Sequence, residues 1–200
     1  MNTETTALSI ALIFFLVANP IGNSPTILAL VRHYDFDRQK KIVFREAIIS
    51  FIIALFFQFF GELFLGALKI SDFALSLTGG IVLFMISLQM IFHKPENANE
   101  STLKQEPFIV PIATPLISGP GLMTMIMVTS REEQNNFKIT LAIFIAWIGV
   151  TAVLTSAPYL QKLIGKRGME GLEQIMGMIL GLISMGMIVN GAKLFVKTLS

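Results

Sequence analysis

The stretch that decides the fold reads Asn19-Pro20-Ile21-Gly22-Asn23-Ser24-Pro25-Thr26, and a related stretch, Thr114-Pro115-Leu116-Ile117-Ser118-Gly119-Pro120-Gly121, begins 95 residues later. In each copy, two prolines lie five residues apart inside a long apolar run. A proline removes a backbone N–H donor and clashes with the carbonyl one turn earlier, so we expect both helices to unwind between their prolines. Such breaks survive in a membrane only where protein or a water-filled cavity covers them. Matched breaks in the two halves of a chain indicate the binding site of a transporter.

The composition is that of an integral membrane protein. Of the 200 residues, 54% are hydrophobic and only 14% are charged, whereas globular domains carry about 25% charged residues. The net charge of +2 is too small and too scattered to indicate a nucleic-acid partner. The absence of cysteine excludes disulfides and thiolate metal sites. The first residues lack the basic region of a cleaved signal peptide, so we expect the first apolar segment to remain as a spanning helix.

Six apolar segments are long enough to cross the hydrocarbon core, which needs about 20 residues. They cover residues 8–31, 47–68, 73–92, 108–129, 139–160 and 172–196. The polar stretch 94–107 predicts a cytoplasmic linker between a first half, residues 1–93, and a second half, residues 108–200. The predicted fold class is therefore an all-α integral membrane protein with six transmembrane helices.

A second internal match supports the division into halves. Residues 80–91 resemble residues 177–188 at an offset of 97. Identities occur at Gly80/Gly177, Leu83/Leu180, Ile86/Ile183, Ser87/Ser184, Met90/Met187 and Ile91/Ile188. With three spans in each half, the halves must enter the membrane from opposite sides. We therefore expect two inverted three-helix repeats, with helices 1 and 4 broken at the proline and glycine motifs.

The loop charges predict the orientation, because lysine and arginine collect on the cytoplasmic side. Ten of these residues fall on one predicted side and five on the other. The richer side holds Arg32, Arg38, Lys40, Lys41, Arg45, Lys94, Lys104, Lys162, Lys166 and Arg167; the poorer side holds Lys69, Arg131, Lys138, Lys193 and Lys197. The richer side is predicted to be cytoplasmic, which places both termini in the periplasm if the membrane is a bacterial inner membrane.

Several stretches together resemble the MarC family of bacterial inner-membrane proteins. They are residues 19–25, 77–84, 111–121, 172–177 and 190–191, and the resemblance extends over essentially the whole chain. It implies small-molecule transporters of six spans, related in layout to amino-acid exporters, in a bacterial inner membrane. The first motif of the family commonly opens with Asp-Pro, whereas this chain has Asn19 there. A fixed negative charge at this position is therefore not expected.

The two breaks are the candidate substrate-binding site. Exposed amides at the start of a half-helix suit carboxylate or phosphate groups, and freed carbonyls suit cations. Neutral polar side chains and glycines would complete a site for a small polar or zwitterionic solute. The candidate residues are Asn19, Pro20, Gly22, Asn23, Ser24, Pro25, Thr114, Pro115, Ser118, Gly119, Pro120 and Gly121. The alternative interpretation is that both kinks only allow the first and fourth helices to cross closely.

Few charged residues lie within the spans. Glu62 could carry a coupling proton if it is buried, and Asn190 is a second candidate coupling residue; carboxylates near a helix end more often reach the interface. His33 and His93 have no second ligand at helical spacing, so neither a metal site nor a cofactor is expected. No Ser/His/Asp set lies at one depth, which argues against an enzyme.

Two functions therefore remain. The first is an inverted-repeat carrier with its solute between the breaks. The second is a non-transporting scaffold that would assemble, as a homo-oligomer for example, through glycine faces such as Gly177-x-x-x-Gly181. A carrier should gather its polar residues at mid-membrane, whereas a scaffold should spread small residues along one outward stripe.

Overall fold

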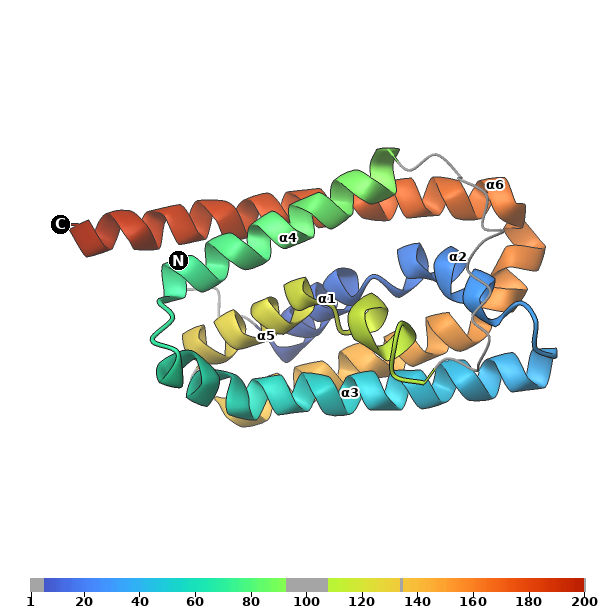
Figure 1. Cartoon of the computed structure of the whole chain (residues 1–200), viewed down its shortest axis with the longest axis horizontal. Helices are drawn as coiled ribbons and strands as arrows, with labels where there is room; N and C mark the ends of the chain where they lie inside the picture. Colours follow the sequence, from blue (N-terminus) through green and yellow to red (C-terminus); the bar gives the residue numbers. More distant parts are fainter. Residues whose placement is uncertain (1–5, 93–107, 134, 200) are drawn as a thin grey trace.

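The computed structural model describes residues 6–92, 108–133 and 135–199, and these residues form helices and no strand. The helices are α1 (Ala7–Ala18), α2 (Pro20–Val31), α3 (Phe36–Ala67), α4 (Asp72–Phe92), η1 (Ile112–Ile117), α5 (Pro120–Glu132) and α6 (Asn136–Leu199). Figure 1 shows an elongated bundle in which the helices run along the long axis. The predicted all-α class is confirmed.

Within the described residues, five helical segments are long and apolar enough to cross a membrane, whereas six were predicted. They are Ala7–Val31, Phe36–Ala67, Asp72–Phe92, Asn136–Gly165 and Arg167–Thr198. The predicted segment 108–129 is not a continuous helix, because it is divided into the π-helical turn η1 and the helix α5, with Ser118 and Gly119 between them. The predicted linker 94–107 lies outside the described residues.

The helix α3 begins at Phe36, so residues 36–46, which lie between the predicted spans 8–31 and 47–68 and were expected to be a linker, are helical. The side chain of Asp35 explains the early start, because it accepts a hydrogen bond from the N–H of Arg38 at 3.2 Å and caps the helix. With 32 residues, α3 is about 48 Å long, whereas the hydrocarbon core is about 30 Å thick. Part of α3 therefore extends beyond the hydrocarbon.

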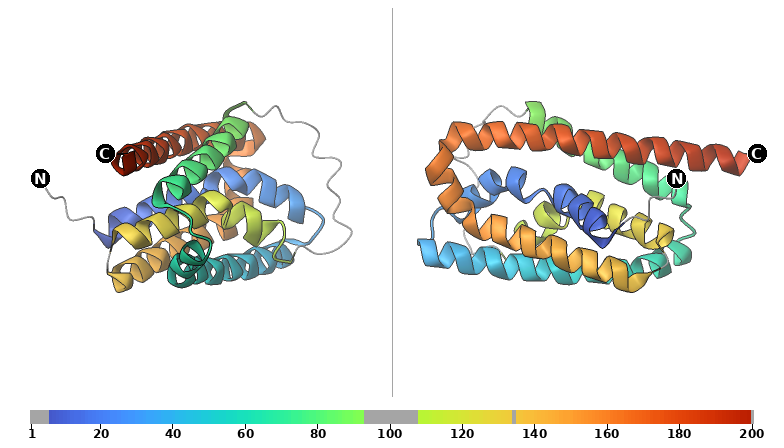
Figure 2. Two further views of the ribbon diagram at one scale, coloured as in Figure 1. Left: turned by 60° about the vertical axis from the view of Figure 1, so that its left-hand side comes forward. Right: turned by 180° about the vertical axis from the view of Figure 1, so that it is seen from behind.

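The helix α6 also differs from the prediction, because it includes most of the expected linker 161–171. Only Gly165 departs from helical geometry (φ 72°, ψ 176°), in the left-handed region that glycine adopts readily. Figures 1 and 2 show that α6 bends sharply at one end of the bundle and returns along its length. The first half of α6, Asn136–Gly165, packs antiparallel to α3, since Gln58 bonds to Thr140 while Lys40 bonds to Tyr159.

The outward face of α3 is apolar, as expected for contact with lipid. The side chains of Phe56, Phe59, Phe60 and Leu63 are all exposed. In water, an exposed apolar surface of this kind would favour aggregation. The opposite face is a buried stripe at spacings of three and four residues, formed by Ile42, Val43, Glu46, Ala47, Ser50, Ala54, Gln58, Gly61 and Leu65. This polarity, apolar outside and partly polar inside, fits an integral membrane protein.

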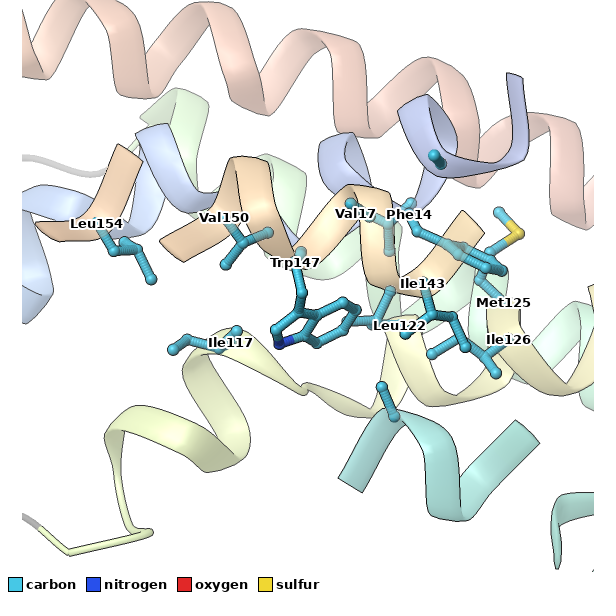
Figure 3. Close-up of a cluster of buried hydrophobic side chains, with 14 of the residues drawn as sticks. Phe14, Val17, Ile117, Leu122, Met125, Ile126, Ile143, Trp147, Val150 and Leu154 are labelled. Atoms are coloured by element: carbon cyan, nitrogen blue, oxygen red, sulfur yellow. The ribbon is translucent and has the colours of Figure 1, made fainter. Parts of the chain in front are cut away.

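The core lies where α1, α5 and the first half of α6 meet. Phe14 and Val17 of α1 pack there with Leu122, Met125 and Ile126 of α5 and with Ile143, Trp147, Val150 and Leu154 of α6 (Figure 3). Ile117 of η1 closes one side of the same cluster (Figure 3). The two segments that carry the proline motifs are therefore held in the interior of the bundle.

Candidate functional site

The interruption between α1 and α2 is confined to Asn19. Its backbone is left-handed (φ 50°, ψ 51°), and it both ends α1 and caps α2. The Asn19 Oδ1 accepts a hydrogen bond from the N–H of Gly22 at 3.2 Å, and its Nδ2 donates to the sulfur of Met90 in α4 at 3.0 Å. Asparagine tolerates the left-handed conformation better than most residues. Pro20 suits the first helical position because a missing N–H costs nothing there.

The prediction that the chain unwinds from Pro20 to Pro25 is wrong. Residues Pro20–Val31 are helical, and Pro25 lies inside α2. A proline within a helix removes one backbone hydrogen bond. Because α2 is already started by Pro20 and capped by Asn19, Pro25 costs that bond without ending the helix. The irregular backbone of the first motif is therefore one residue long.

The irregular backbone of the second motif is longer. Within η1, Thr114 is extended (φ −136°, ψ 130°), and Ser118 (φ −98°, ψ 71°) separates η1 from α5. Gly119 is the residue before Pro120, which begins α5. Because glycine has no side chain, no side-chain hydrogen bond caps the start of this helix. A Cβ atom on Gly119 would lie 2.8 Å from the carbonyl oxygen of Pro115, so a larger residue would not fit this turn.

The two motifs meet through the side chain of Asn23. Its Nδ2 donates to the carbonyl of Leu116 at 2.7 Å and to the carbonyl of Ala18 at 3.1 Å. The Ala18 carbonyl is free because the N–H of Gly22, its usual helical partner, bonds to the Asn19 side chain. One amide therefore satisfies a carbonyl from each motif, although the residues are 93 positions apart.

Ser118 anchors the second motif to α3. Its hydroxyl donates to the backbone carbonyl of Ser50 at 3.0 Å, in the middle of α3. Its own N–H donates to the carbonyl of Ala113 at 2.8 Å. Both serine side chains are almost completely buried. The second motif is therefore positioned by hydrogen bonds to two other elements, α2 and α3.

The twelve predicted site residues differ in burial. Six are buried, four are half-buried and two are exposed. The buried ones are Asn19, Pro20, Gly22, Ser24, Ser118 and Gly121; the half-buried ones are Asn23, Pro25, Thr114 and Gly119; the exposed ones are Pro115 and Pro120. The polar members thus face the interior, while two of the four prolines face outward.

The two predicted coupling residues lie apart from the motifs. Glu62 is exposed, so the condition for its predicted role, burial, is not met. Asn190 is half-buried, and its Nδ2 donates to Oε1 of Glu132 at the far end of α5. Glu132 is the thirteenth residue of α5, about 18 Å along the helix from Pro120. A solvent-open pocket of about 110 Å³ at this end is lined by Asp72, Leu75, Val128, Arg131, Glu132 and Leu194.

Sequence reasoning missed the polar cluster around Trp147. The indole N–H donates to the Oγ of Ser50 at 2.9 Å and to the carbonyl of Ala47 at 3.1 Å. The signal was present, because Trp147 lies in the middle of an apolar span and a buried indole N–H needs an acceptor. This cluster joins α3 to the first half of α6 next to Ser118.

Glu46 was also missed as an interior residue. Because Glu46 directly precedes the predicted span 47–68, the sequence predicts it at the cytoplasmic start of that helix, where it would pair with Arg45 or meet lipid headgroups. The pairing is confirmed, with Arg45 Nη2 2.8 Å from Glu46 Oε1, but the Glu46 side chain is fully buried. The helical spacing could have revealed this, because Glu46 lies one turn before Ser50 on the same stripe.

The chemistry of the site is neutral. Asparagine amides, serine hydroxyls and irregular backbone surround the contact between Asn23 and Leu116. In the part of the chain that the structure describes, no group of three or more His, Cys, Asp or Glu side chains could hold a metal ion. Such a set of groups can hydrogen-bond a small polar solute, and the start of α5, which has no side-chain cap, can face a negative group.

The sequence agrees with known membrane proteins over nearly its full length. Residues 5–196 match a family described as MarC family integral membrane proteins. A UPF0056 membrane protein of Buchnera aphidicola subsp. Acyrthosiphon pisum is 34% identical over 194 residues, covering 96% of this chain and 99% of its own length. The UPF0056 inner membrane protein YhgN of Escherichia coli K12 is 32% identical over 192 residues, covering 95% and 98%. No solved structure matches. The chain is a member of the MarC family of integral membrane proteins.

Proposed function

We propose that this protein is a secondary carrier, and not an enzyme, that binds a small polar or zwitterionic solute between the two proline motifs near the middle of the membrane. The observation that carries the proposal is the hydrogen bond from Asn23 to the Leu116 carbonyl, which joins the two proline motifs. Irregular backbone is costly in a bilayer unless it is covered or lines a cavity. In a carrier, irregular backbone of this kind forms part of the solute site.

The solute class follows from the groups that surround this contact. Asn19, Asn23 and Ser118 offer amides and hydroxyls, and the start of α5 offers backbone N–H groups without a side-chain cap. A carboxylate could take the place of that cap, and an ammonium or hydroxyl group of the solute would replace Asn23 as the donor to the Ala18 and Leu116 carbonyls. The neutral side chains favour a solute whose charges balance.

We further propose that the halves are inverted repeats, and the packing of α4 against the second half of α6 supports this. A Cβ atom on Gly80 would lie 3.0 Å from the carbonyl oxygen of Ser184, and one on Gly177 would lie 3.1 Å from that of Ser87. Gly80 and Gly177 are 97 positions apart, as are Ser87 and Ser184. A two-fold rotation that interchanges the two repeats would therefore also interchange these two contacts. An axis of this kind in the membrane plane is what inverted repeats require.

In this proposal, η1 and α5 together form the fourth of six crossings. From Ile112 to Glu132 there are 21 residues, which in helical form would span about 31 Å, close to the thickness of the hydrocarbon core. The segment also packs against α1 (Figure 3). Both termini then lie on one side of the membrane, which the loop charges predict to be periplasmic.

Single-cysteine labelling tests the number of crossings, because the chain contains no cysteine of its own. Thr6→Cys and Thr198→Cys report the two ends, and Lys41→Cys reports the proposed cytoplasmic end of α3. All three side chains are exposed. In intact cells, a membrane-impermeant maleimide should label Thr6→Cys and Thr198→Cys, and should label Lys41→Cys only after permeabilisation. Labelling of only one terminus would show an odd number of crossings and would refute the six-span proposal.

Transport itself is tested in proteoliposomes with a panel of radiolabelled amino acids, organic acids and cations. We expect uptake of a zwitterionic solute that falls strongly in the double variant Asn23→Ala with Ser118→Ala. Thr26→Ala is the matched control, because Thr26 is an exposed polar residue of the same helix as Asn23. Uptake that is unchanged in the double variant would remove these residues from the mechanism.

The scaffold alternative is weakened by the location of its glycines. Gly177 and Gly181 face Ser87 of α4 within the same chain, so this glycine pair is already covered. In the segment Arg167–Thr198, Cβ atoms on Gly171 and Gly186 would meet no atom of the described residues within 4 Å, but two open glycines so far apart are not a packing stripe. A homo-oligomer that forms equally well with Gly186→Leu would argue further against assembly through this face.

A further inference from the structure

We propose that Glu46 takes up and releases the proton that couples transport, an assignment that rests on the carrier function proposed above. The Glu46 side chain is fully buried, although it lies in a helix whose outer face contacts lipid. Ionisable residues inside membrane proteins are costly and usually belong to ion or substrate pathways. Neither the predicted site nor the carrier proposal uses this carboxyl group.

The two oxygens of the carboxyl group have different surroundings. Oε1 accepts hydrogen bonds from Arg45 Nε at 3.0 Å and from Arg45 Nη2 at 2.8 Å. Oε2 is buried and has no hydrogen-bond partner among the described residues. A buried charged oxygen without a partner is expensive, and adding a proton removes that charge. Oε2 is therefore the atom on which the O–H bond would form.

The position of Glu46 links it to the second motif. Ser50 follows Glu46 by four residues, about 6 Å along α3, and its carbonyl accepts the Ser118 hydroxyl. The guanidinium of Arg45 lies 5.1 Å from the ring centre of Phe108, just before η1. A change of charge at Glu46 is thus felt by two groups that hold or precede the second motif. Protonation of Glu46 would therefore change the interactions that position the second motif, which is part of the proposed solute site.

Among the described residues, few charged groups face Glu46 from neighbouring elements. The elements that pack on α3 are η1, α5 and α6, and η1 contains no titratable residue. Arg131 and Glu132 lie at the far end of α5, and Lys138 lies at the far end of the first half of α6. Near the cytoplasmic end, Tyr159 bonds to Lys40, and Lys162 lies 5.3 Å from the Phe36 ring centre. Arg45 is therefore the only described ion-pair partner of Glu46.

A proton fits this site better than a metal cation. One free carboxylate oxygen is enough to bind a proton, whereas a bound metal cation needs several oxygen ligands. The described chain contains no group of three or more acidic or His side chains around such a centre. In one cycle, Oε2 would gain a proton from water on one side of the membrane and release it to water on the other.

The test follows the carboxyl group directly and needs no solute. Infrared difference spectra are recorded on the purified full chain in lipid nanodiscs, from about pH 9 to about pH 4. We expect a C=O stretching band of a buried protonated carboxylic acid that disappears in Glu46→Gln and persists in the exposed control Glu62→Gln. Glu46→Asp should shift the band, which gives a second readout if Glu46→Gln is poorly folded.

Three outcomes would overturn the assignment of the proton to Glu46. If wild type shows no such band, Glu46 stays ionised as a static partner of Arg45. If the band survives in Glu46→Gln, another group is responsible. A carboxylate band that responds to Na⁺ but not to pH would assign the site to a metal cation. If the band behaves as expected while no solute of the panel is transported, the carrier proposal fails and the protonation site stands.

Discussion

The indole N–H of Trp147 lies 2.9 Å from the hydroxyl oxygen of Ser50, in the middle of two antiparallel membrane helices. The backbone carbonyl of the same serine accepts the hydroxyl of Ser118. One turn of α3 therefore holds both the first half of α6 and the second proline motif. Because Trp147 is the only tryptophan of the chain, its fluorescence reports on this junction.

Replacing Trp147 by phenylalanine should destabilise the protein without unfolding it. The variant loses the hydrogen bonds to Ser50 and Ala47, and an inter-helix bond of this kind contributes about 1 kcal/mol in membrane proteins. Thermal unfolding in detergent, followed by far-ultraviolet circular dichroism, should give a lower Tm than wild type. Ile148→Val is the control, because Ile148 is exposed, and it should leave the Tm nearly unchanged. An unchanged Tm in Trp147→Phe would show that the junction is held by packing alone.

At Asn19, glycine should be tolerated better than leucine. Glycine keeps the left-handed conformation and loses the cap, at a cost of a few tenths of a kcal/mol, together with the hydrogen bond to the Met90 sulfur. Leucine loses the cap and also meets the left-handed penalty of about 1–2 kcal/mol. The free energy of unfolding should therefore fall in the order wild type, Asn19→Gly, Asn19→Leu. Equal stability of the two variants would contradict the left-handed backbone at this residue.

Alanine at Gly80 should be destabilising, whereas alanine at Gly66 should not. The new methyl group at Gly80 would lie 2.7 Å from Ile188 and 3.0 Å from backbone atoms of α6, and overpacking of this kind costs about 1–3 kcal/mol. At Gly66 a methyl group meets nothing within 4 Å, so helix propensity should raise stability by about 0.5–1 kcal/mol. Opposite shifts in Tm are expected. A neutral Gly80→Ala would mean that α4 and α6 separate more easily than their close contact implies.

The turn between α5 and α6 should lose stability in acid. The Lys138 ammonium, bonded to Glu133, holds the pKa of that carboxyl below its ordinary value, and the N–H of Asn135 acts in the same direction. A carboxyl group whose pKa is lowered by folding stabilises the folded state above its unfolded pKa, and the contribution is lost as the pH falls through the folded pKa. Glu133→Gln should therefore flatten part of the acid limb of a plot of Tm against pH. Lys138→Met should have the same effect, and Glu62→Gln should not.

How much the sequence could predict depends on what each residue does locally. Pro20 and Pro120 each begin a helix, as expected for residues that need no N–H at the first position. Pro25 misled the prediction, because a proline inside a capped helix removes one bond without ending the helix. The hydrogen bond from Asn23 to the Leu116 carbonyl depends on how α2 and η1 are placed relative to each other. The local sequence does not specify that placement.

Burial was harder to predict than helix position. Glu62 was the candidate for a coupling carboxylate on the condition that it is buried, but it falls outside the stripe of α3 that faces the bundle, whereas Glu46 falls on it. The difference is one of helical phase, because residues three and four apart share a face while sixteen residues bring the chain to nearly the opposite side. The start of α3 at Phe36 hid this phase, since residues 36–46 were predicted to be a loop.

Because a single left-handed residue, Asn19, joins α1 to α2, a rotation of its backbone would tilt α1 as a rigid body. With 12 residues, α1 is about 18 Å long, so a rotation of about 10° at Asn19 would displace its far end by about 3 Å. Ile10, near that far end, would carry most of this movement into the buried core, while Phe14 and Val17, closer to Asn19, would move less (Figure 3). A small torsional change at one asparagine is thus geometrically sufficient to rearrange contacts along half the thickness of the bilayer.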